Sequence, residues 1–185
     1  MTQQPVTKKL LVLDLDETLF FASEARLAQA EDFVVGDYFV YLRPQVKTFL
    51  LFCQTHFDVA VWTASTESYA AEMIARLFAN STTLRFVWGR KRCTYRYDAE
   101  RQEQYWIKDL KKVRRLGYDL ANVIAIDDTT RNWERTYGNV VAVKRFVGEA
   151  DDDELRLLIS YLDELRQVED VRTIEKRHWR ALSKC

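Results

Sequence analysis

Four short segments of the chain carry side chains whose types could perform chemistry together. The first is Asp14-Leu15-Asp16-Glu17-Thr18, in which two carboxylates stand two residues apart. The others are Thr63-Ala64-Ser65, Lys108, and the adjacent acids Asp127 and Asp128. Carboxylate oxygens are the ligands that Mg²⁺ prefers, and a phosphate group can supply further oxygen ligands. The residue types therefore predict a site that combines a magnesium ion with a phosphate.

Phosphoryl transfer to a carboxylate explains why such a site needs positive charge. A carboxylate that approaches a phosphate dianion to about 4 Å meets a repulsion of about 8 kcal/mol at an effective dielectric constant of about 20. Mg²⁺ and Lys108 would offset this repulsion and stabilise the charge on the transferring group. Asp14 is our candidate nucleophile, which would form an aspartyl-phosphate. Asp16 is our candidate acid/base, which would protonate the leaving oxygen and then accept a proton from water.

The remaining candidates would bind phosphate or contact the substrate. We expect the Thr63 hydroxyl and backbone groups from Ala64 onward, at the start of the following helix, to hold the phosphoryl oxygens together with Lys108. Arg90 and Arg92 could make bidentate contacts to a phosphorylated partner, although plain surface charge is the alternative interpretation. The two Asp residues of the first segment could likewise be turn or capping residues, but the three other segments argue against this.

Alternating apolar runs and amphipathic stretches indicate how these segments are brought together. We expect strands at residues 10–15, 57–62, 84–88, 122–126 and 139–143, and helices from Pro44, after Thr66, over 108–116 and over 151–165. The Gly36-Asp37 pair is typical of a turn and indicates a hairpin within residues 34–40. This alternation predicts an α/β fold with a doubly wound parallel sheet, whose ligand site lies beyond the carboxyl ends of the strands. The candidate residues fall at those ends.

The length and composition limit the number of domains and the classes of partner that we expect. The 185 residues fit one domain, 1–185, with its core over about 9–172, and 28 Lys plus Arg balance 28 Asp plus Glu. A net charge of zero argues against stable nucleic-acid binding. We expect no membrane association, because no apolar run approaches 18 residues, and a cytoplasmic location, or a nuclear one in a eukaryote. The composition does not indicate an oligomeric state.

The motifs resemble those of a known enzyme family. Asp14-Leu15-Asp16-Glu17-Thr18 is similar to the DxDx(T/V) signature of the haloacid dehalogenase (HAD) superfamily. The segments Trp62-Thr63-Ala64-Ser65, Ile107-Lys108-Asp109-Leu110 and Ile126-Asp127-Asp128 resemble its FCP/SCP branch, the phosphatases related to those that act on the RNA polymerase II C-terminal domain. The similarity extends over residues 10–172, and four motifs in order are far more specific than one.

The resemblance implies a role for each matching residue. Asp14, Asp16 and Asp127 would be the magnesium ligands, with Asp16 contributing its backbone carbonyl. Thr18 and Asp128 could lie behind these ligands. Asp128 departs from the Asn that is common in the branch, and its extra carboxylate could tighten metal binding through water or weaken phosphate binding. The short segment between Thr18 and Arg43 implies a HAD-like fold without a large cap domain. An open site of this kind accepts bulky substrates, so we expect a Ser/Thr phosphatase that acts on a phosphorylated protein or peptide.

Three other functions compete with this interpretation. A small-molecule or nucleic-acid phosphatase could use the same residues. A receiver-like phospho-accepting signalling domain also combines acids, a Thr and a Lys around Mg²⁺, but Asp16 stands ready to act as acid/base, which a long-lived phospho-switch avoids. A catalytically dead interaction module is disfavoured by the intact pair of Asp14 and Asp16.

Overall fold

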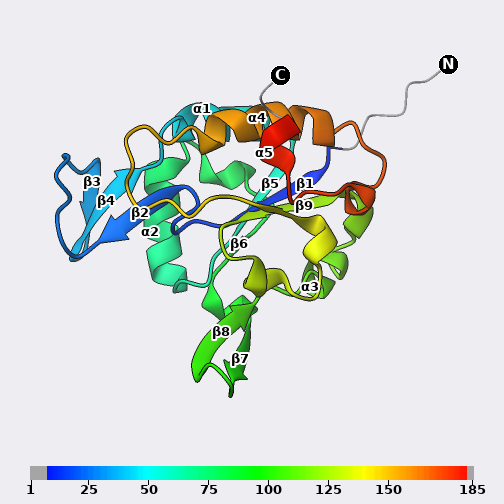
Figure 1. Ribbon diagram of the computed structural model, residues 1–185, viewed down its shortest axis with the longest axis horizontal. Helices are drawn as coiled ribbons and strands as arrows, with labels where there is room; N and C mark the ends of the chain where they lie inside the picture. Colours follow the sequence, from blue (N-terminus) through cyan, green and yellow to red (C-terminus); the bar gives the residue numbers. More distant parts are fainter. Residues whose placement is uncertain (1–7, 183–185) are drawn as a thin grey trace.

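A five-stranded parallel sheet forms the centre of the molecule (Figure 1). The computed structural model describes residues 8–182. Every pairing between neighbouring strands of this sheet is parallel. This arrangement confirms the predicted α/β fold. In spatial order the strands are β10 (Val140–Ala142), β9 (Val123–Asp127), β1 (Leu10–Leu13), β5 (Asp58–Trp62) and β6 (Val87–Trp88).

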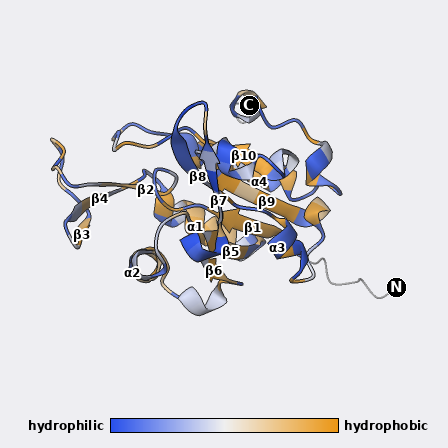
Figure 2. Ribbon diagram, turned by 90° about the horizontal axis from the view of Figure 1, so that it is seen from below, coloured by the Kyte–Doolittle hydropathy of each residue, from blue (hydrophilic) through white to orange (hydrophobic). Residues whose placement is uncertain are grey.

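The central strand β1 consists of four apolar residues, all fully buried. Because side chains alternate along a strand, Leu11 and Leu13 join one hydrophobic cluster and Leu10 and Val12 join another. Such a strand must be covered on both faces, which is the usual situation in parallel sheets. Figure 2 shows the resulting apolar band through β1 and β9. The larger cluster includes buried residues of α1 (Val46–His56), α2 (Glu67–Leu77), α4 (Glu154–Leu165) and α5 (Trp179–Leu182); the smaller one includes residues of α3 (Lys111–Arg114).

Two antiparallel elements flank the central sheet. A three-stranded sheet contains β2 (Phe20–Ser23), β4 (Tyr38–Leu42) and β3 (Phe33–Val35), and the turn between β3 and β4 confirms the predicted hairpin at Gly36. A separate hairpin of β7 (Thr94–Asp98) and β8 (Glu103–Ile107) extends away from the core (Figure 1). The described chain between Thr18 and Arg43 forms only the small sheet, which agrees with the expected absence of a large cap.

The structure corrects several predicted elements. The helix expected over 108–116 is wrong in extent, because α3 spans only Lys111–Arg114. Lys108 instead follows β8 in extended chain, where its backbone N–H donates to the Asn132 carbonyl at 2.7 Å. The strand expected over 84–88 is reduced to β6, and the helix expected from residue 151 begins at Glu154. The β7–β8 hairpin was not predicted.

Short 3-10 turns connect several of these elements. They cover 81–83, 90–92, 120–122, 130–133, 137–139 and 171–173. None of the helices in residues 8–182 combines the length and the apolar character that a membrane crossing requires.

Candidate active site

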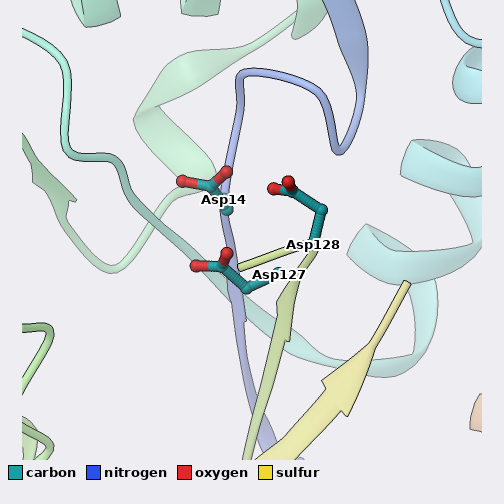
Figure 3. Close-up of side chains that lie close together, drawn as sticks. All are labelled: Asp14, Asp127 and Asp128. Carbon is teal, nitrogen blue, oxygen red and sulfur yellow. The ribbon is translucent and has the colours of Figure 1, made fainter. Parts of the chain in front are cut away.

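The first and fourth acidic segments meet because their strands are neighbours. Leu13 of β1 pairs with Ile126 of β9, so that Asp14 and Asp127 leave the sheet side by side. The Asp14 backbone N–H donates to the Ile126 carbonyl at 3.0 Å and continues the ladder to this point. Figure 3 shows the side chains of Asp14, Asp127 and Asp128 gathered beyond the strand ends. The sheet register therefore places two segments that are more than 100 residues apart in one site.

Lys108 bridges the two strand ends. Its Nζ lies 2.5 Å from Asp14 Oδ1 and 2.6 Å from Asp127 Oδ2, and its side chain is fully buried. The indole Nε1 of Trp133 donates to the same Oδ2 of Asp127 at 2.7 Å. Burial alone would lower the pKa of Lys108, but the Asp127 and Asp14 carboxylates raise it above its ordinary value. Lys108 is therefore a firmly charged ammonium in the centre of the acidic group.

Asp14 lies in a nearly closed environment, with 6 % of its surface exposed. Burial raises the pKa of its carboxyl well above the ordinary value; Lys108 opposes this rise, and Asp127 and Asp16 add to it. A further positive charge beside Asp14 would favour its ionised form, which is the form that acts as a nucleophile.

Asp128 completes a group of three carboxylates. Asp14, Asp127 and Asp128 each offer one oxygen within 4.8 Å of the other two. Thr18 connects two of them, because its hydroxyl lies 3.4 Å from Asp14 Oδ2 and 3.3 Å from Asp128 Oδ1. Burial, followed by the charge of Asp127, raises the pKa of Asp128. Three carboxyl groups thus gather around the ammonium of Lys108, and this all-oxygen donor set fits a hard divalent cation.

The Asp16 side chain lies outside this group of three. Its carboxylate accepts hydrogen bonds from Ser65 Oγ at 2.8 Å, the Tyr69 hydroxyl at 3.0 Å and Thr63 Oγ1 at 3.3 Å. Glu17 has a φ of 59°, and this left-handed residue turns the chain directly after Asp16. The two acids of the first segment therefore have different partners: Asp14 contacts Lys108 and Thr18, whereas Asp16 contacts the hydroxyls that follow β5.

The second segment follows β5 and faces Asp16. Thr63 is buried, and its hydroxyl also accepts from the Ser65 backbone N–H at 3.0 Å. The Ala64 carbonyl accepts from Arg90 Nε at 2.6 Å. Thr66 caps α2 by accepting from the Tyr69 N–H. These bonds define the loop that leads from the strand end into the helix.

A cavity of about 320 Å³ opens beside Asp16. Asp16 lies in its wall together with Ser65 and Tyr69, whose hydroxyls both donate to the Asp16 carboxylate, and Arg90 also lines it. Arg92, the second arginine of the predicted pair, lines a different hollow. The complete lining is Asp16, Ala22, Tyr38, Ser65, Thr66, Tyr69 and Arg90.

A buried ion pair supports the loop after β1. Arg43 Nε and Nη2 donate to the two oxygens of Asp152 at 2.7 and 2.8 Å, and Arg43 Nη1 donates to the Thr18 carbonyl at 3.0 Å. Burial opposes ionisation of Asp152, but Arg43 overcomes this effect and holds the pKa of the carboxyl below its ordinary value. Thr18 is thereby fixed from its backbone side while its hydroxyl contacts two of the acids.

Sequence reasoning missed three contributors to this site. Tyr69 was expected to face inward as an apolar helix residue, Trp133 to act in packing, and Ser65 to cap a helix. Arg43 was expected either to anchor its loop or to touch substrate, and the structure shows the anchor. A hydroxyl or indole N–H close to a strand end is the only sequence signal that could have marked the first three.

Comparisons with known proteins agree with the geometry. Residues 9–172 match the family model described as NLI interacting factor-like phosphatase. The chain is 30% identical over 188 residues to CTD nuclear envelope phosphatase 1 of Xenopus laevis, covering 94% of this chain and 73% of the relative. It is 32% identical over 182 residues to the probable C-terminal domain small phosphatase of Dictyostelium discoideum, covering 94% of this chain and 56% of the relative.

A solved structure shares the fold. The structure of Fcp1, described as an essential RNA polymerase II CTD phosphatase, superposes with a TM-score of 0.56 at 16% identity. The match covers 90% of this chain and 52% of that one, so the present chain spans about half the length of the Fcp1 structure.

Proposed function

Because the chain belongs to the NLI interacting factor-like phosphatases, we propose that it removes phosphate from serine and threonine residues of proteins through an aspartyl-phosphate on Asp14. The observation that carries this proposal is the contact of Lys108 with both Asp14 and Asp127 at the ends of adjacent strands. Phosphorylated proteins or peptides are the proposed partners. The cytoplasm is the proposed compartment, or the nucleus in a eukaryotic cell, where some relatives are named for the nuclear envelope.

Asp14 is the proposed nucleophile, and the buried Lys108 orients it. The ammonium binds one oxygen of Asp14, Oδ1, and leaves Oδ2 to the Thr18 hydroxyl and to attack on phosphorus. Attack forms the bond from the Asp14 oxygen to phosphorus and breaks the bond from phosphorus to the substrate oxygen. Mg²⁺, held by Asp14 and Asp127 with Asp128 and the Asp16 backbone carbonyl beside them, would supply positive charge to the transferring group.

Asp16 is the proposed acid/base. In the first step it gives a proton to the leaving serine or threonine oxygen, and in the second it takes a proton from the water that attacks the aspartyl-phosphate. The hydroxyl groups of Thr63, Ser65 and Tyr69 hold its carboxylate at the cavity, where a leaving group would enter. Thr63, with the Ala64 backbone and Lys108, forms the proposed phosphate-binding set.

The absence of a large cap favours a polypeptide substrate over a small one. The cavity beside Asp16 is bounded by the small three-stranded sheet, α2 and the turn at Arg90, and it is open to solvent. Arg90 is exposed and stands at its edge, where a guanidinium can pair with a phosphate or a backbone carbonyl.

The test is the rate of phosphate release by the wild type and by Asp14→Asn, at fixed Mg²⁺, from an aryl phosphate. We expect repeated turnover by the wild type and a loss on the order of a thousandfold or more in the variant. Asp163→Asn, the same change at an exposed position of α4, is the matched control and should retain wild-type activity. A wild type that is labelled once without turnover would favour a receiver-like domain.

A substrate panel separates protein from small-molecule hydrolysis. Phosphopeptides, nucleotides and sugar phosphates are compared by kcat/KM under the same conditions. Preference for phosphoserine and phosphothreonine peptides supports the proposal, whereas preference for a nucleotide or sugar phosphate would replace it with a small-molecule phosphatase on the same site.

A further inference from the structure

A second hollow, distinct from the cavity beside Asp16, lies at the edge of the central sheet. It has a volume of about 360 Å³ and adjoins β6, the last strand in the spatial order. We call it the Arg92 hollow. Its lining residues include four cations and no acid: Arg85, Phe86, Trp88, Arg92, Lys112, Arg115 and Leu116.

Two aromatic rings, together with Leu116, form the apolar part of the Arg92 hollow. Phe86 and Trp88 stand two residues apart on extended chain and therefore share a face, with ring centroids 4.0 Å apart and ring planes at 24°. The guanidinium carbon of Arg92 lies 5.2 Å from the centroid of Trp88. A charge beside this apolar wall is less well solvated than on an open surface, so its attraction for an anion is stronger.

Most of the positive charge in the hollow has no acidic partner. Arg85 pairs with Asp58 at 2.8 Å. Within residues 8–182, none of the ion pairs involves Arg92, Lys112 or Arg115. Lys112 donates from Nζ to the Arg92 carbonyl at 2.6 Å, and this neutral acceptor leaves its charge uncompensated. The hollow thus offers three cations to an anionic group.

One turn of chain joins the Arg92 hollow to the proposed substrate cavity. The 3-10 turn Arg90–Arg92 presents Arg90 to the cavity and Arg92 to the hollow. The Arg90 backbone N–H donates to the Ser65 carbonyl at 2.8 Å, which fixes one end of the turn to the loop that contacts Asp16. The bond from Lys112 fixes the other end to α3. A polypeptide bound at Asp16 therefore has a cationic hollow within the reach of a short extended segment.

We propose that the Arg92 hollow binds a second phosphate group on the same polypeptide, so that the substrate class is a multiply phosphorylated segment. This inference rests on the proposed function. The second phosphate pairs with Arg92, Arg115 and Lys112, while a neighbouring apolar side chain of the substrate packs on Phe86 and Trp88. The reacting phosphate occupies the site at Asp14.

The test compares singly and doubly phosphorylated peptides of one sequence, with the second phosphoserine moved stepwise along the chain on each side of the first. We expect kcat/KM for the wild type to be roughly tenfold higher at the best spacing, which corresponds to about 1.4 kcal/mol. The advantage should fall at other spacings and at high salt, because separated charges are screened.

Two neighbouring arginines provide matched variants. Arg115, the residue directly after α3, lines the hollow, whereas Arg114, the exposed last residue of α3, does not. Arg115→Ala and Arg92→Ala should remove most of the advantage of the doubly phosphorylated peptide, whereas Arg114→Ala should preserve it. Arg114→Ala and Arg115→Ala should hydrolyse an aryl phosphate at the wild-type rate, which shows that Asp14 and its partners are intact.

Several results would overturn the inference while leaving the proposed function in place. Equal kcat/KM for singly and doubly phosphorylated peptides at every spacing is one. Another is an equal loss of the kcat/KM advantage in Arg114→Ala and Arg115→Ala, since this would indicate a general effect of positive charge. Tighter binding of a single-stranded oligonucleotide than of the best peptide, lost in Arg115→Ala, would assign the hollow to nucleic acid. Failure to hydrolyse any phosphopeptide, with an active aryl phosphatase, would instead contradict the proposed function itself.

Discussion

At the scale of single residues, the two acids of the first segment are separated by their contacts. Asp14 bonds to the Lys108 ammonium, whereas Asp16 accepts from three hydroxyl groups. An ammonium stabilises an anion that must attack. The three hydroxyl groups orient the Asp16 carboxylate at the cavity, where a proton would pass to the leaving oxygen and from water.

We predict that Asp16→Asn slows turnover by about 100-fold to 10,000-fold, the usual contribution of general acid–base catalysis. Asparagine preserves the shape of the side chain but cannot accept a proton from water, so the aspartyl-phosphate on Asp14 should accumulate. Intact-protein mass spectrometry after mixing with an aryl phosphate measures the adduct, and phosphate release measures turnover. Wild-type turnover in the variant would refute the role of Asp16.

At the scale of elements, the Arg43–Asp152 pair connects the chain before α1 to the chain before α4. It also holds the Thr18 carbonyl, and so links both helices to the loop that follows β1. Both side chains are almost fully buried, at 0% and 3% exposure. Removal of one member of such a pair leaves an uncompensated buried charge, which typically costs about 3–5 kcal/mol.

We predict that Asp152→Asn lowers the free energy of unfolding by about 3 kcal/mol at neutral pH. Because Arg43 depresses the pKa of Asp152 in the folded protein, the stabilisation is present above the ordinary carboxyl pKa near 4 and is lost as the pH falls below it. The difference between variant and wild type in urea unfolding should therefore shrink from pH 6 toward pH 3, as roughly estimated from that ordinary value. Asp153→Asn, at the exposed neighbouring position, should show no comparable loss. A difference that does not depend on pH would contradict this account.

The sheet and much of the site could be predicted because apolar runs that end in acids are local signals. Leu10 to Asp16 and Asn122 to Asp128 each contain a strand and its acidic end, and the α/β pattern predicts that such ends meet at one edge of a parallel sheet. Lys108 was identified as a site residue, but the prediction that it begins a helix was wrong. The basic residues after it indicate a helix, whereas the chain before it pairs with β7 in a hairpin of largely polar residues that lacks alternation.

The direction of the Asp16 side chain could not be predicted. It depends on Glu17 adopting a left-handed conformation, which residues other than glycine seldom do, and on the Tyr69 hydroxyl reaching back from α2. The bond from Trp133 to Asp127 likewise depends on a 3-10 turn whose position is set by the packing of Trp62 against Trp133. Tertiary contacts of this kind leave no local pattern in the sequence.

At the scale of the whole molecule, the three carboxyl groups gathered in the site oppose folding, because burial and mutual repulsion disfavour their ionised forms unless a cation is bound. We predict that saturating Mg²⁺, at about 100 times its dissociation constant, stabilises the protein by about 2.7 kcal/mol. This corresponds to a rise in Tm of about 5–10 °C for a chain of this length. Asp128→Asn removes one of the three carboxyl groups and should show weaker Mg²⁺ affinity and a smaller rise.

Differential scanning calorimetry with Mg²⁺ and with EDTA measures these shifts independently of catalysis. The exposed control Asp163→Asn should respond as the wild type does. An equal rise in Tm for Asp128→Asn and the wild type would exclude Asp128 from the cation site, and no rise for either would argue against a cation at Asp14 and Asp127.

Trp133 gives the molecule a built-in optical probe. Its indole N–H bonds to Asp127, its ring lies 5.5 Å from the Lys108 ammonium, and it is fully shielded from solvent. Indole emission responds to nearby charge. Binding of Mg²⁺ to the acidic cluster, or phosphorylation of Asp14, should therefore change the intrinsic fluorescence without any added dye. Stopped-flow emission, compared between the wild type and Trp133→Phe, can thus follow each chemical stage in real time.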